Sequence, residues 1–165
     1  MDSMDDDLRP EYEESTFAGA IRGKYAQRTP SVHDNDVYGF TFNGEASRLT
    51  LHTLYRHITP HEYTDVVFCD VVAHYFEHVL SGNILFDVCD VTPDAIVDRF
   101  AGLFVSSWRF GWPTLEYRGD LDLLKSLLRE NGVKGFDIES SYGMTGWVLC
   151  KSCEHRSRDA RRELA

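Results

Sequence analysis

The stretch ILFDVCDVTPDAIVDRFAGLF, residues 84–104, contains a change of hydrophobic period that decides the fold class. Every second residue from Ile84 to Val88 is apolar, and this period of two predicts a β-strand. Thr92 predicts the N-cap of a helix with Pro93 at its first position, and the apolar residues beyond it recur at helical spacing. A strand therefore leads directly into an amphipathic helix that can cover one face of a sheet.

Period-two patterns predict further strands on both sides of this stretch, and Asp120 predicts the N-cap of a second helix that stops near Gly132. The expected elements are strands at 37–42, 48–55, 63–76 and 84–90, helices beginning after Thr92 and Asp120, and strands at 133–139 and 145–151. Strands grouped on either side of a helix pair are typical of an α+β fold. We expect an antiparallel sheet in the order ββββ-αα-ββ, with two helices packed on one face.

Alternation within the strands also predicts the direction of individual side chains. In the first, Tyr38, Phe40 and Phe42 should share one side. In the second, His52 should face outward. The run 63–76 is read as one strand, bent or bulged near Asp70.

Composition and charge divide the 165 residues into three parts. Residues 1–34 open with an acidic block and are expected to form a mostly extended arm. Residues 35–153 carry the hydrophobic patterns of a single α+β domain. Residues 154–165 are a basic tail, expected to fray or to form a short terminal helix.

The formal net charge of -10 disfavours binding of nucleic acid by the body of the protein, because phosphates would be repelled. No apolar run is long enough to span a membrane, and the acidic N-terminus lacks the apolar core of a secretory signal. Four cysteines without signs of export are expected to be free thiols in a reducing compartment. These features predict a cytoplasmic protein.

The segment HYFEH, residues 74–78, matches the H-x-x-E-H pattern of a zinc protease family. That pattern binds zinc only on a helix, where residues four apart share a face. The β-branched flank before His74 predicts a strand, on which His74 and His78 would lie ~13 Å apart. Glycine-rich nucleotide loops and a G-x-S-x-G nucleophile elbow are absent from the sequence. We therefore expect neither enzymatic activity nor a cofactor.

Cys150 and Cys153, with His155 two residues further on, are the remaining metal candidates. A structural zinc site needs four ligands, commonly from two C-x-x-C knuckles, and the sequence has no second knuckle. Cys69 or Cys89 could complete the set only if the fold brought them together. The pattern more often belongs to a strand end with free thiols, so no metal site is predicted.

Aromatic residues are concentrated after the first helix and recur in the last hairpin. Trp108, Trp112 and Tyr142 are candidates for contact with a partner, because tryptophan and tyrosine are enriched at interfaces. Large aromatic side chains between a helix and a sheet are more often core. Both interpretations stay open from the sequence.

Residues 10–12 (PEY) and 22–28 (RGKYAQR) resemble short bacterial antitoxin-like proteins, which share a P-E-Y segment followed by R-G-K-Y-x-x-R. This resemblance adds Glu11, Tyr12, Lys24 and Tyr25 as candidate partner-binding residues. Residues 87–151 are separately similar to an uncharacterised bacterial α+β family, which implies no activity.

The sequence thus suggests a non-enzymatic bacterial interaction protein of antitoxin or immunity type that binds another protein, expected to be basic. The alternative is a small-molecule or metal-binding α+β domain, using either the final hairpin or the cysteine and histidine cluster.

Overall fold

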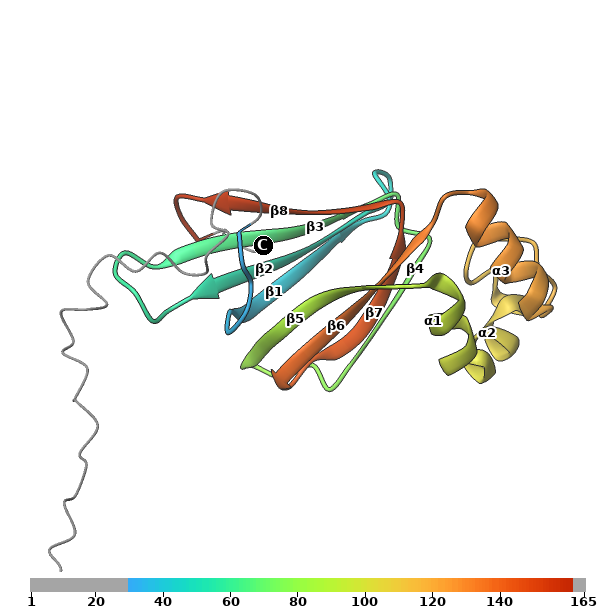
Figure 1. Ribbon diagram of the computed structural model, residues 1–165, viewed down its shortest axis with the longest axis horizontal. Coiled ribbons are helices and arrows are strands. Elements are labelled where there is room, and N and C mark those ends of the chain that lie inside the picture. The colour runs from blue at the N-terminus through green and yellow to red at the C-terminus, as the bar shows by residue number, and fades with distance from the viewer. Residues whose placement is uncertain (1–29, 162–165) are drawn as a thin grey trace, which may run out of the picture.

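The computed structural model describes residues 30–161, in which eight strands form one antiparallel sheet and the helices are short (Figure 1). The expected arm up to residue 29 lies outside the described residues. The elements are β1 (Asp36–Asn43), β2 (Arg48–Tyr55), β3 (Glu62–Cys69), β4 (Ala73–Glu77), β5 (Asn83–Val91), α1 (Pro93–Arg99), α2 (Ala101–Ser107), the 3-10 helix η2 (Trp108–Phe110), α3 (Leu121–Glu130), β6 (Lys134–Tyr142), β7 (Thr145–Cys150) and β8 (Ser152–Arg158). A sheet with a small helical layer agrees with the predicted α+β class.

The sheet, in the order β4-β7-β6-β5-β1-β2-β3-β8, is folded into two layers (Figure 1). The pairing at the middle of the sheet is short, because β1 and β5 share only two residue pairs, Asp36 with Ile84 and Val37 with Asn83. The two strands then separate, so β1, β2, β3 and β8 form one layer and the other four strands form the second.

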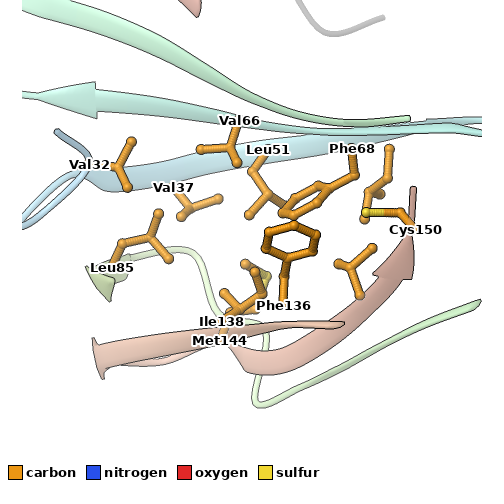
Figure 2. Packing of buried hydrophobic residues seen from close by; sticks show 12 residues of the cluster. Val32, Val37, Leu51, Val66, Phe68, Leu85, Phe136, Ile138, Met144 and Cys150 are labelled. Atoms are coloured by element: carbon orange, nitrogen blue, oxygen red, sulfur yellow. The ribbon is translucent and has the colours of Figure 1, made fainter. Parts of the chain in front are cut away.

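The main hydrophobic core lies between the two layers (Figure 2). Leu51 and Val66 point into it from one layer, and Ile138 points into it from the other. Phe68 and Phe136 meet across the gap edge to face, with ring centroids 5.8 Å apart. Burying each such side chain stabilises the fold by roughly 1.5–3 kcal/mol, which makes this packing the main force joining the layers.

The helices cover the outer face of the β4, β7 and β6 layer and form a second core with it. The side chain of Thr92 accepts a hydrogen bond from the Ala95 amide, and Asp120 caps α3 in the same way, so both predicted N-caps are confirmed. The first predicted helix is divided into α1 and α2, because Phe100 leaves helical geometry at φ -112° and ψ 27°. Trp147 of β7 is fully buried under this layer.

The prediction of one strand over 63–76 was wrong. The chain leaves β3 at Asp70, which has a φ of 53°, and crosses to the other layer. The amide of Val71 then donates to Ser47 and the amide of Val72 donates to Leu149, so the chain contacts both layers as it crosses. β4 pairs with β7 rather than continuing beside β2. Five strands consequently precede the helices, and the predicted ββββ-αα-ββ order is not found.

The prediction for the basic tail was also wrong. Residues up to Arg158 form β8, which pairs with β3 from Cys69 opposite Ser152 to Tyr63 opposite Arg158. This pairing covers an edge of β3 that would otherwise have unpaired backbone groups. Three strands therefore follow the helices.

Candidate functional site

The H-x-x-E-H segment lies on a strand up to Glu77, and its β-branched flank predicted a strand there. His74 belongs to β4, and His78 follows the end of that strand with a φ of 55°. Within residues 30–161, no group of three or more His, Cys, Asp and Glu side chains is arranged to hold a metal ion. The motif match therefore has no geometric support.

The cysteine candidates meet at the corner where β3, β7 and β8 converge. Burial raises the pKa of the Cys150 thiol to about 12, and Cys153 reaches about 12 for the same main reason. Nδ1 of the third candidate, His155, donates to the carbonyl oxygen of Pro30 at 2.7 Å. Thiols this weakly acidic stay protonated near neutral pH, so neither cysteine is an activated nucleophile.

The partner-binding candidates fall into different environments. Glu11, Tyr12, Lys24 and Tyr25 lie outside the described residues. Trp108 is 39% exposed and Tyr142 is 58% exposed, so both side chains reach solvent.

Trp112 is instead half-buried in the helical layer. Its indole stacks on Phe104 with ring centroids 5.4 Å apart and also contacts Trp147 at 5.9 Å. Of the two open interpretations for Trp112, core packing describes these contacts.

A polar network on the outer face of β1, β2, β3 and β8 was not predicted. His52 does face outward on β2, yet its exposure is 0%. Its Nδ1 donates to Oδ1 of Asp65 at 2.8 Å, and the hydroxyl of Thr41 lies 3.1 Å from its Nε2. Arg158 pairs with the second oxygen of Asp65 at 3.1 Å and donates to the hydroxyl of Tyr38 at 2.7 Å. Four strands are thereby joined by charged and polar side chains.

The order Thr41, His52, Asp65 is that of a hydroxyl, a base and an orienting carboxylate. A hydrolytic nucleophile also needs an exposed turn and oxyanion donors around it. Thr41 instead lies within the β1–β2 ladder, opposite Thr50. This placement favours a structural role in which the network docks β8 against the sheet.

The second unpredicted site is a row of apolar side chains from β1, β4 and the turn after β4, which we call the aromatic groove. It consists of Phe40, Phe42, His74, Phe76, Val79 and Leu80. The rings of Phe40 and Phe76 meet edge to face at 5.3 Å, and Phe42 lies 5.1 Å from the His74 ring. Phe42, Val79 and Leu80 are each 50% exposed, so this apolar row is open to solvent.

His74 is the one titratable side chain of the aromatic groove. It lies between Phe42 and Phe76, whose ring centroids are 5.1 and 5.6 Å away. Burial lowers the pKa of its imidazole, since a cation there would lose hydration. At neutral pH the ring is therefore uncharged and extends the apolar surface.

A cavity of about 330 Å³ continues the aromatic groove beyond Phe40. Its wall includes Val37, Leu80 and Met144, with no charged side chain. Asn83 supports the far wall: its Oδ1 accepts from the amides of Leu80 and Met144, at 2.9 and 3.0 Å. These bonds hold the turn after β4 in place, so the cavity is built by the fold.

The alternation in the sequence predicted that Phe40 and Phe42 share one side of a strand, but it did not predict the rest of the aromatic groove. Phe40 and Phe42 do share a side, but Tyr38 faces the polar network, so its predicted placement beside them was wrong. A β-bulge between Val37 and Gly39 shifts the alternation at that point. The meeting of β1 with β4 depends on the crossing of the chain at Asp70, for which no local pattern is a signal.

Comparison of the chain with family models, curated protein sequences and solved structures gives no match. The residues themselves must therefore carry any functional argument.

Proposed function

We propose that this protein is a non-enzymatic interaction protein that binds a protein partner through the aromatic groove. The observation that carries the proposal is the continuous row of partly exposed apolar side chains, among them Phe42, Val79 and Leu80. Exposed apolar surface that is contiguous, rather than scattered, marks binding sites on soluble proteins. Rings that are already packed against one another lose little side-chain entropy when a partner covers them.

The chemistry of the aromatic groove supports binding rather than catalysis. A general acid or base needs a titratable group near its working pH, with a partner that orients it. In the aromatic groove the only titratable side chain is His74, whose depressed pKa keeps it neutral between two phenyl rings.

Charge favours a basic partner. Residues 30–161 contain 19 acidic and 12 basic side chains, so the described part of the chain is acidic even without the N-terminal block. Complementary charge speeds association with a basic protein and disfavours acidic competitors. Together with the likeness of residues 9–28 to antitoxin-like proteins, this supports a partner relationship of antitoxin or immunity type.

A direct test uses affinity capture from cells that encode the protein, followed by reconstitution with the purified partner. Phe42→Asp places a charge in the exposed part of the aromatic groove, and Phe110→Asp makes the same change at a side chain that is 81% exposed on η2. We expect the wild type and Phe110→Asp to bind the same partner, with ~10-fold or greater loss for Phe42→Asp. Equal binding by all three proteins would contradict the proposal.

The cavity supports one alternative, a small-molecule site. Its volume of about 330 Å³ lies at the lower end of the range for ligand pockets, roughly 300–1,000 Å³. Native mass spectrometry of protein purified from its own cells distinguishes the two functions. A stoichiometric small molecule that Met144→Trp displaces would favour this alternative.

A further inference from the structure

We infer that the partner binds as an extended strand that adds to β4 and covers the aromatic groove with its apolar side chains. This inference rests on the proposed function and specifies how the partner is recognised. The occupant is a segment of a basic protein in which apolar residues alternate with lysine or arginine.

The first support is that β4 is an unprotected edge. It lies at one end of the sheet and pairs with β7 alone among the described strands. In an antiparallel edge strand, alternate residues direct their N–H and C=O groups away from the neighbouring strand. A free row of backbone donors and acceptors is the feature that an added strand recognises.

The opposite edge of the same sheet provides an internal contrast. β8, with the sequence SCEHRSR, carries three charged side chains, and two of them, the exposed Arg156 and Glu154, form an ion pair. Such charges discourage pairing with another chain. β4, with the sequence AHYFE, has one charge and no lysine or proline. Of the two terminal strands of the described sheet, β4 is the one whose outer edge lies beside an apolar flank.

The side chains of β4 have suitable directions. His74 and Phe76 pair with Val148 and Gly146 and face the interior side, toward Phe42 and Phe40. A strand added to β4 would place every second side chain on that same side. Those side chains would lie over Phe40 and Phe42, the exposed rings of β1.

The position of β4 is held firmly before any partner arrives. A Cβ on Gly146 would lie 2.0 Å from the carbonyl oxygen of Tyr75, so β7 approaches β4 as only glycine allows. Tyr75 also packs on Trp147 with ring centroids 6.2 Å apart. A preorganised edge avoids part of the ordering cost of binding.

The charge of the protein favours an added strand with basic side chains. The acidic excess of residues 30–161 favours lysine or arginine at the positions that face solvent. Glu77 ends β4 on the opposite face from His74 and Phe76, where its side chain is 43% exposed and accepts a hydrogen bond from the Tyr75 hydroxyl at 3.4 Å. The basic side chains of an added strand would lie on that face, so Glu77 offers one local contact for such a cation.

The test uses an eight-residue synthetic peptide of alternating valine and lysine, capped at both ends, and its affinity is measured by isothermal titration calorimetry. Two further peptides carry N-methyl groups on alternate residues, one in each register. Removing the N–H groups that face β4 should abolish binding, whereas methylation in the other register should preserve it. A valine–glutamate peptide should bind at least ~10-fold more weakly.

Protein variants locate the binding. Phe42→Asp should weaken the valine–lysine peptide by ~10-fold or more, and Phe110→Asp should leave its affinity unchanged. Hydrogen exchange should slow at β4 amides when the peptide binds. Failure of the peptide to bind, or equal tolerance of both N-methyl registers, would overturn strand addition. A partner that binds the aromatic groove without protecting β4 amides would overturn it too and leave the proposed function standing. A dimer paired through β4, seen by sedimentation, would assign the edge to a second copy instead.

Discussion

Two histidines on strands of the same sheet have opposite environments. His52 is fully buried and has a polar partner at each ring nitrogen, Asp65 at 2.8 Å and Thr41 at 3.1 Å. His74 is half-buried between two phenyl rings, and burial lowers the pKa of its imidazole. The first histidine is committed to joining strands. The second is part of an apolar surface that remains open, so the comparison separates a structural site from the proposed binding site.

The largest effect is expected when the network around His52 is broken at its centre. Asp65→Ala removes the carboxylate that pairs with both His52 and Arg158, and it leaves the buried His52 ring and the guanidinium of Arg158, which is 24% exposed, without this partner. Breaking a buried ion pair on one side costs about 3–5 kcal/mol. Urea denaturation should show this loss, while the exposed-residue control Asp159→Ala should stay within about 0.5 kcal/mol of wild type. A small loss for Asp65→Ala would mean that the network does not stabilise the sheet.

Trp112 tests whether the aromatic cluster under the helices is packed as core, in contrast to the open aromatic groove. Its indole is half-buried against Phe104 and Trp147 under the helical layer. Trp112→Ala should cost about 3 kcal/mol, the lower part of the range for aromatic truncation in a core. Phe110→Ala on η2 is the matched control, expected to change stability little. An unchanged urea midpoint for Trp112→Ala would contradict core packing and favour Trp112 as a partner contact.

The burial of His74 can be tested by measuring stability against pH. Because the folded state lowers the pKa of His74, the unfolded chain binds this proton more readily, and the resulting stabilisation is present above the unfolded value of 6.5. It is lost as the pH falls through 6.5 toward the folded pKa. His74→Phe cannot take up this proton, so its free energy of unfolding should fall less than that of wild type between pH 7 and pH 5. Parallel curves would show that His74 is not desolvated in the folded protein.

The smallest effect on stability is expected from the exposed ring of the aromatic groove. Phe42 is 50% exposed, so Phe42→Ala should cost less than about 1 kcal/mol in urea denaturation. The same variant should weaken partner binding clearly, because the lost ring faces the bound segment. A stability loss as large as that of Trp112→Ala would place Phe42 in the core and contradict an open aromatic groove.

Local patterns in the sequence were enough to predict many of the elements. Alternation identified β1, β2 and β5, and the caps at Thr92 and Asp120 marked where helices begin, because a cap bonds to amides only two or three residues away. The strand environment of His74 also followed from its β-branched neighbours. These features depend on contacts within a few residues.

Only the tertiary structure decided how the strands are joined and where binding surface remains. β4 pairs with residues 68 to 76 positions away, and β8 completes a layer begun by β1, through backbone bonds that nearly every residue type can make. Alternation puts His52 on the outer face of its layer and Phe42 on the inner face, but it does not show that His52 is buried in a network or that Phe42 lies beside a distant strand. Burial and pairing are properties of the assembled layers, whereas periodicity records only which side of its own strand a residue occupies.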